Sequence, residues 1–381
     1  MLAGGGVLAS LLLLEVAIRW LHLVPDRFWQ PDPTLGARLV PGASGWWTQE
    51  EREFLVPVEV NSLGLHDHEH PYEKPAGVTR VLVLGDSFTE AIHVPLDSGF
   101  PMVLERNLNQ GNGGQRYEVI NAGVSGYGTA SATLFFEQEG WRYQPDVVLL
   151  AFYPGNDIRN NSPTLEDAFR PVYADDGELE RVQPTKIASA ERGWLGRSAA
   201  YRFLRQLVLV RQPAIGRALV RIGWMKPEAL RAPAQTDGIP VGFGMYQVPP
   251  DEVWLDAWQR TERLLDRLRS SVETRGARFA VALVTAREQV YPDTWQEILS
   301  NHQAMRQRQW DLEEPQRWLQ RWCSQRGVAC LDLANSFQRK ATSGGRMLHY
   351  RHDGHWTDAG HELGGILIAD FLRQTVLSTH N

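Results

Sequence analysis

The chain has 381 residues, which is enough for two average domains or for one α/β domain with insertions. Apolar residues make up 43% of it and 14 residues are tryptophan, so a packed core is possible and global disorder is excluded. The formal net charge of −6 argues against general affinity for nucleic acid. The two cysteines, Cys323 and Cys330, belong to no Cys-x-x-Cys motif or Cys/His cluster. We therefore expect a buried structural role for them and no zinc or redox chemistry.

Residues 1–24 form the most apolar segment, which Glu15 and Arg19 interrupt after fourteen uncharged residues. That length is borderline between a buried helix and a membrane span of ~20 residues. The two charges are spaced i, i+4, so they can pair at the outer end of a tilted helix. No Lys or Arg precedes the apolar run and no Ala-x-Ala site follows it, so a cleaved signal peptide fits poorly. We expect an uncleaved anchor in the lipid bilayer, with a helix docked on the domain as the alternative.

Residues 25–79 are rich in Pro, Gly and Trp, which predicts turns and short irregular strands in an accessory extension. Within it, His66, His68 and His70 alternate with acidic residues and would share one face of a strand. The composition of five residues alone does not identify a metal site, however, and Pro71 indicates that the segment is a solvated turn. We therefore expect no metal there.

From residue 80 onward, predicted strands and helices alternate regularly along the chain. Continuous apolar runs predict buried strands over residues 81–84, 117–121, 146–153, 279–284 and 328–333. Helical patterns lie between them, and Thr357 is expected to cap the last helix. Five strands alternating with helices predict an α/β fold with a doubly wound parallel sheet.

A long insertion, residues 158–249, divides this core into residues 80–157 and residues 250–381. Within the insertion, residues 192–226 hold eight basic residues and no acidic residue, interleaved with apolar ones. Such a stretch fits either a helical lid with a solvated outer face or a helix on an anionic membrane surface.

Polar residues follow the carboxyl ends of the first three predicted strands, where open α/β sheets bind ligands. Ser87 follows the first strand, and a serine hydroxyl needs a base to take its proton and a third group to hold that base. His355 is the candidate base. Asp353 is the candidate acid, because residues i and i+2 of an extended segment project to the same side. Donors for an oxyanion are expected from the Ser87 and Gly126 N–H groups and the Asn156 side chain.

The blocks Gly85-Asp86-Ser87, Gly126, Gly155-Asn156-Asp157 and Asp353-Gly354-His355, in that order, resemble the signature of the SGNH, or GDSL-type, serine hydrolase family. The resemblance implies a flavodoxin-like three-layer α/β/α sandwich and an acyl-serine mechanism without cofactor or metal. It assigns Ser87, His355 and Asp353 to a catalytic triad, and Ser87, Gly126 and Asn156 to the oxyanion hole. Gly123 is a second candidate for the glycine donor. Relatives with a similar amino terminus carry one membrane helix, which implies a catalytic domain on the outer side of the cytoplasmic membrane.

Two alternatives concern the site and the reaction. Relatives more often show Asp-x-x-His, which Asp358 and His361 match, but Thr357 would place both in the first turn of a helix. The expected function is hydrolysis of short acyl or acetyl esters of a glycan, lipid or small molecule, with no obligatory protein partner. The alternative is an O-acyltransferase acting on a cell-envelope or exported polysaccharide, because residues 353–356 are similar to a block of alginate O-acetyltransferases. A catalytically idle module would lack a triad member, and every candidate is present.

Overall fold

The computed structural model describes residues 2–49, 51–110, 114–165, 171–173, 179–180, 198–211, 215, 235–236 and 238–378. At its centre is a five-stranded parallel sheet with the strand order β13-β12-β7-β5-β6. The strands are β5 (Val78–Gly85), β6 (Arg116–Gly123), β7 (Val147–Phe152), β12 (Arg278–Leu283) and β13 (Ala329–Asp332). All five predicted strands are therefore confirmed, with small shifts of their ends.

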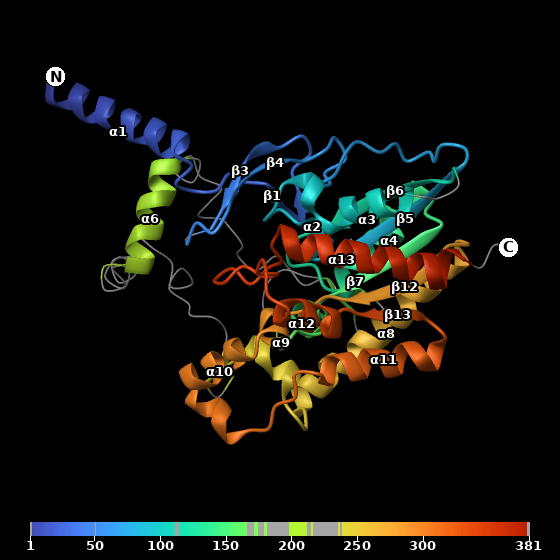
Figure 1. Ribbon diagram of the computed structural model, residues 1–381. Coiled ribbons are helices and arrows are strands. Elements are labelled where there is room, and N and C mark those ends of the chain that lie inside the picture. Colours follow the sequence, from blue (N-terminus) through green and yellow to red (C-terminus); the bar gives the residue numbers. More distant parts are fainter. Residues whose placement is uncertain are drawn as a thin grey trace.

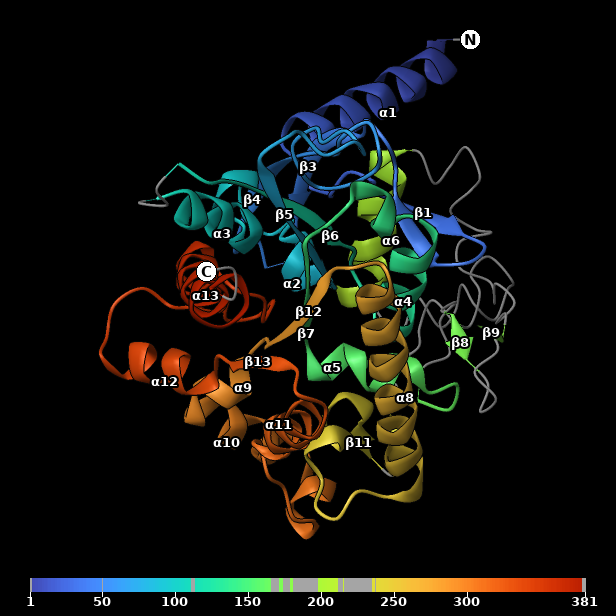
Figure 2. The same ribbon diagram turned by 90° about the vertical axis from the view of Figure 1, so that its right-hand side faces the viewer.

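Helices cover both faces of this sheet (Figures 1 and 2). One layer consists of α3 (Phe100–Asn109), α12 (Ala334–Thr342) and α13 (Asp358–Phe371). The other consists of α4 (Thr129–Gln138), α8 (Glu252–Thr274) and α11 (Glu314–Arg326). The predicted three-layer α/β/α architecture is confirmed, and Thr357 is the residue that caps α13.

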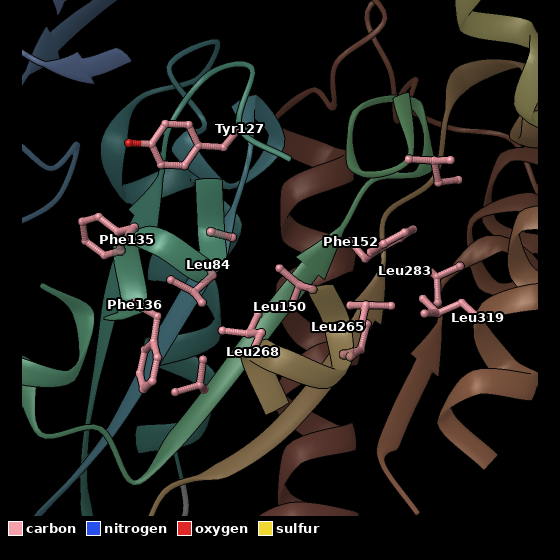
Figure 3. Packing of buried hydrophobic residues seen from close by; sticks show 14 of the residues in the cluster. Leu84, Tyr127, Phe135, Phe136, Leu150, Phe152, Leu265, Leu268, Leu283 and Leu319 are labelled. Atoms are coloured by element: carbon pink, nitrogen blue, oxygen red, sulfur yellow. The ribbon is translucent and has the colours of Figure 1, made fainter. Parts of the chain in front are cut away.

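The apolar runs are continuous because each strand is buried on both sides. In β5, Val81 and Val83 pack with the first helical layer, while Leu82 and Leu84 pack with the second. All four are at most 1% exposed, as expected when alternate side chains meet opposite helical layers. Figure 3 shows the second interface, where Leu84 of the sheet lies in one cluster with aromatic side chains of α4 and leucines of α8.

The register of the sheet brings several connections to one edge. Gly85 at the end of β5 lies beside Gly123 of β6 and Ala151 of β7. The helix α2 (Ser87–Glu90) follows β5, and the helix α5 (Pro154–Asp157) follows β7. The segment after β12 leads in the same way to α9 (Arg287–Val290) and α10 (Pro292–Asn301). Parallel strands thus deliver their following loops to a common edge.

The amino-terminal extension contains two antiparallel hairpins, as its composition predicts. They are β1 (Trp29–Asp32) with β2 (Gly36–Leu39), and β3 (Ser44–Thr48) with β4 (Leu55–Glu59). Phe28, Leu39 and Val58 pack in one cluster with Ile92. This contact ties the extension to the segment that follows α2.

The histidine-rich segment of the extension is only in part the solvated turn that Pro71 suggests, because His68 and Glu69 are exposed whereas His66 and Asp67 are buried. The buried side chains of His66 and Asp67 have hydrogen-bond partners in the core domain. Asp67 accepts a hydrogen bond from the Asn121 N–H at 2.8 Å, and His66 Nδ1 lies 2.6 Å from the Glu90 carbonyl oxygen. His68 faces Asp97 at 3.2 Å and His70 faces Asp67 at 3.6 Å. The three imidazoles therefore have three different partners.

The first helix, α1 (Leu2–Trp20), extends away from the sheet, and α6 (Ala199–Arg211) lies against its carboxyl-terminal end (Figure 1). The charged residue Glu15 within the apolar run has hydrogen-bond partners at the start of α6. Its carboxylate accepts hydrogen bonds from the Ser198 hydroxyl at 2.8 Å and from the Ala199 and Ala200 N–H groups at 2.9 and 2.8 Å. Arg19 pairs with Glu15 at 2.6 Å, as its spacing predicts. Along the chain from residue 2, outside the gaps given above, no helix is long and apolar enough to cross a membrane.

Besides α6, the described residues of the insertion include a short 3₁₀ helix over Val241–Tyr246. Short pairs of strands form over β8 (Val172–Tyr173) with β9 (Leu179–Glu180), and β10 (Gln235–Thr236) with β11 (Ile239–Pro240). Of the basic stretch 192–226, residues 198–211 and 215 are described and the others lie outside the described residues. The predicted lid or membrane-facing role of this stretch stays a prediction.

The two cysteines lie on adjacent elements of the core. Cys323 on α11 is buried, and Cys330 on β13 is half-buried against the same cluster. Both are free thiols. Their packing agrees with the structural role expected from the sequence.

Candidate active site

Ser87 begins α2 immediately beyond the carboxyl end of β5. Asp86 caps the turn, because its carboxylate accepts a hydrogen bond from the Phe88 N–H at 2.9 Å. Ser87 is 8% exposed, so its hydroxyl lies at the boundary between the core and solvent.

The loop before α13 brings His355 to this serine. Ser87 Oγ lies 2.7 Å from His355 Nε2, and His355 Nδ1 lies 2.7 Å from Asp353 Oδ1. Asp353 Oδ1 also accepts the His355 backbone N–H at 3.1 Å. Burial alone would raise the pKa of Asp353, but the hydrogen bond and charge of His355 lower it below its ordinary value. A hydroxyl, an imidazole and a carboxylate are therefore aligned, with the hydroxyl proton in reach of a base.

Glu53 of the extension holds the loop that carries this pair. Its carboxylate accepts hydrogen bonds from three successive backbone N–H groups, those of Arg351 at 2.7 Å and of His352 and Asp353 at 2.9 Å. No sequence signal pointed to Glu53, because it lies about 300 residues from the loop it holds.

The competing pair, Asp358 and His361, lies elsewhere. His361 is buried in α13, and its Nδ1 accepts a hydrogen bond from the Phe100 N–H at 3.2 Å. Asp358 pairs with Arg346 at the surface. Neither residue faces Ser87, in agreement with the assignment of both to the first turn of the helix.

The three predicted oxyanion donors belong to the serine turn and to two segments that are hydrogen-bonded to it, one through Ser125 and Glu90 and the other through Asn156 and Asp86. Gly126 has a φ of 77°, a conformation that favours glycine, and no hydrogen bond of its N–H is found within the described residues. Asn156 Nδ2 donates to Asp86 Oδ2 at 2.6 Å, which leaves its second N–H available. Gly123 lies within β6, and its N–H already donates to Asn121 Oδ1 at 3.0 Å. Of the two glycines, Gly126 is thus the one with an available donor.

Glu90 fixes the segment that carries Gly126. Its carboxylate accepts hydrogen bonds from the Ser125 N–H at 2.8 Å, from the Ser125 hydroxyl, and from Trp29 Nε1 at 2.9 Å. Glu90 is fully buried, and burial raises its pKa to about 7. The sequence analysis missed this residue, although an acid only three positions after Ser87, next to a buried strand, is a signal for it.

His93 stacks on His355. The ring centroids are 3.9 Å apart and the rings are inclined by 13°. Burial first, and then the charge of His355, hold the pKa of His93 well below its ordinary value, so His93 is neutral. The Phe88 ring also packs on His355, with 4.8 Å between the ring centroids. Together, His93 and Phe88 restrain the plane of the His355 imidazole.

His93, His355 and Asp353 also offer ligand atoms within 4.8 Å of one another, so a metal ion has to be considered. A metal binds an imidazole nitrogen in the plane of the ring. The two rings are nearly parallel, so their lone pairs lie in separate planes and do not meet at one point. Both His355 nitrogens already face Ser87 and Asp353. This arrangement fits proton transfer better than metal binding.

Comparisons with known proteins give one match to a protein family. Residues 83–363 match the family model described as GDSL-like lipase/acylhydrolase. No curated protein matches the sequence significantly. Among solved structures, TesA and the acetyl xylan esterase AlAXEase each show 12% identity and a TM-score of 0.39, over 78% of this chain and 99% of theirs. The acetyl xylan esterase Axe2-W215I from Geobacillus stearothermophilus shows 10% identity and a TM-score of 0.40, over 77% of this chain and 94% of its own.

Proposed function

Because this chain belongs to the GDSL-like lipase/acylhydrolase family, we propose that it is a serine esterase that removes a short acyl or acetyl group from a glycan, lipid or small ester. The observation that carries the proposal is the continuous hydrogen-bonded relay from Ser87 Oγ through His355 to Asp353. A serine in this relay is an activated nucleophile.

In the first half of the reaction, Ser87 Oγ attacks the ester carbonyl carbon while its proton passes to His355 Nε2. Asp353 accepts the Nδ1–H and stabilises the imidazolium that forms. The carbonyl oxygen becomes negative, and in this proposal the Ser87 and Gly126 N–H groups and the Asn156 amide donate hydrogen bonds to it. The intermediate then expels the alcohol, which takes the proton from His355, and an acyl-serine remains.

In the second half, water attacks the acyl-serine and gives a proton to His355. The intermediate collapses, the carboxylic acid leaves, and the proton returns to Ser87 Oγ. If a sugar hydroxyl takes the place of water, the same steps give an O-acyltransferase. The alternative reaction thus differs only in the second nucleophile.

The test is a panel of acyl esters, led by p-nitrophenyl acetate and acetylated oligosaccharides, scored for released acid and for acetyl groups moved to added sugars. We expect released acetate as the main product, and longer acyl chains to be cleaved more slowly. No turnover of any ester in the panel by the folded protein would overturn the proposal. Acetyl transfer in excess of acetate release would favour the acyltransferase.

We also propose that residues 1–24 hold the protein at the cytoplasmic membrane, with the catalytic part on its outer side. In support, the consecutive residues Leu11, Leu12 and Leu13 are 53%, 66% and 70% exposed on a helix that extends from the body. Consecutive helical residues point in different directions, so no single protein face covers all three, whereas lipid can.

This location is tested by carbonate extraction of membranes that contain the full-length chain, with a chain lacking residues 1–24 as the control. Retention of the full-length chain alone is the expected result. Release of both chains by carbonate would contradict the proposal.

A further inference from the structure

A pocket of about 330 Å³ opens beside the loop that carries Asp353 and His355. Gly354, which lies between these two residues, forms part of its wall. The opposite walls come from α9 and α10, the two helices that follow β12. The volume falls at the lower end of the range for small-ligand sites. The pocket thus adjoins the loop of the catalytic base, although Ser87, Asp353 and His355 do not line it.

Arg287 of α9 is a cation of this pocket whose hydrogen-bond donors lack acceptors in the described part of the chain. Within the described residues its guanidinium makes no hydrogen bond or ion pair, and its Nε is buried and unsatisfied. It lies over the Tyr291 ring, 5.9 Å from the centroid, and the Tyr291 hydroxyl accepts a hydrogen bond from the Leu348 N–H at 2.9 Å. The guanidinium is thus held beside the catalytic loop. A partly buried cation with an unsatisfied donor is costly unless a ligand supplies an acceptor.

The other charged or titratable residues of the pocket are two glutamates, one arginine and two histidines, and none of them makes a hydrogen bond or ion pair with Arg287 within the described residues. Glu288 accepts a hydrogen bond from the Tyr246 hydroxyl at 3.2 Å. Burial raises the pKa of its carboxyl, whereas this hydrogen bond and the charge of Arg287 lower it. Glu297 is exposed, at the α10 side. Arg351 and His352 line the same pocket from the catalytic loop. Arg287, whose Nε lacks an acceptor among the residues that the structure describes, is therefore the group of this pocket best suited to bind an anion.

We propose that this pocket binds an anionic group, a carboxylate or a phosphate, on the alcohol part of the ester substrate, with Arg287 as its principal contact. The planar guanidinium donates two parallel hydrogen bonds to either group. Thr294, Asn301 and Glu297 on α10 supply the donors and acceptors that hydroxyl groups of a sugar or glycerol need. The inference rests on the proposed esterase function and specifies its substrate class as acidic esters, either O-acetylated uronate sugars or acetylated glycerol phosphates.

The experiment compares three acetylated substrates on the full chain: a neutral xylo-oligosaccharide, a uronate-containing oligosaccharide and a glycerol phosphate, with p-nitrophenyl acetate as the reference ester. Wild type should show a higher kcat/KM for one of the two anionic substrates than for the neutral oligosaccharide, and the preferred one identifies the anion. Arg287→Gln should raise KM for that substrate by about tenfold or more, because a hydrogen bond to a charged group is lost. It should leave turnover of p-nitrophenyl acetate within about twofold.

Arg287→Lys keeps the charge without the planar fork and should give an intermediate KM. The matched control is Arg339→Gln, because Arg339 is exposed on α12 and bonds to Ser336. It should behave as wild type with all substrates. Equal loss of activity on neutral and anionic substrates in Arg287→Gln, or no charge preference in wild type, would overturn the inference. Failure to cleave even p-nitrophenyl acetate would instead overturn the proposed function.

Discussion

At the scale of single residues, the environments of two histidines predict opposite consequences of mutation. His355 contacts Ser87 Oγ, so His355→Ala should lower kcat on p-nitrophenyl acetate by about 10⁴-fold or more. Ser87→Ala should lose about as much, and the double variant should be little worse, because the two residues act as one unit. Asp353→Asn should lower kcat less, since Asp353 orients the base but is not itself the base. Steady-state kinetics of the purified variants would measure these changes in kcat.

His361 is the matched control for this prediction. It is buried in α13 and bonds to the Phe100 N–H, so His361→Ala should cost about 1–3 kcal/mol of unfolding free energy and little kcat. An inactive but folded His361→Ala beside an active His355→Ala would show that the literal Asp-x-x-His spacing identifies the base.

Glu90 is expected to act on the reaction without touching the substrate. In Glu90→Gln, one of the donors from Ser125 or Trp29 faces an amide NH₂ group in place of a carboxylate oxygen, so the Gly126 segment should shift. We expect kcat to fall by about ten- to a hundredfold, because a misplaced oxyanion donor weakens binding of the transition state, while KM changes little. A raised KM with unchanged kcat would contradict this role.

Glu90 also predicts a pH dependence of stability. Its pKa is raised by burial from 4.5 to about 7 in the folded protein, so the folded state binds its proton more tightly than the unfolded state. Its contribution to stability is full below about pH 4.5 and is lost as the pH rises through about 7. Urea unfolding of wild type and Glu90→Gln between these pH values should give a flatter profile for the variant. Parallel profiles would show that the carboxyl does not titrate in this window.

At the scale of elements, Glu15 joins α1 to α6. Its carboxylate occupies the amino terminus of α6, where free N–H groups and the helix dipole favour an anion. Burial acts in the opposite direction, but the backbone N–H groups of Ala200 and Ala199 lower the pKa of Glu15 to about 2. The contribution of this contact to stability is therefore complete above about pH 4.5, and it is lost as the pH falls toward 2.

Glu15→Ala should release α6 from α1 at neutral pH and speed trypsin cleavage after Arg202 or Arg205, while esterase activity is retained. The control is Glu362→Ala, an exposed glutamate on α13. Its cleavage pattern should match wild type. An unchanged cleavage rate in Glu15→Ala would show that the carboxylate does not hold the two helices together.

At the scale of the whole molecule, the sheet could be predicted because its strands are buried on both faces. Val81 to Leu84 form an unbroken apolar run for this reason, and the loops at their carboxyl ends then follow from parallel topology. The extension is different. Its strands are short, and burial of His66 depends on partners in α2 and β6 that no local pattern contains.

The same distinction applies to the site. Asp353 and His355 are two residues apart, so their contact could be expected from local geometry. The stacking of His93 on His355 and the hold of Glu53 on the loop join residues hundreds of positions apart in sequence. One sequence carries no signal for such contacts, because they arise only when the layers pack. The roles assigned to Ser87, His355 and Asp353 stay predictions until they are measured.

The most direct test of the central claim is labelling with a serine-directed phosphonate, followed by mass spectrometry of the peptides. If Ser87 is the nucleophile and His355 its base, wild type should carry one phosphonate on Ser87, activity should fall in proportion to labelling, and His355→Ala should react much more slowly. A label on another serine, or full esterase activity with Ser87 labelled, would contradict the account.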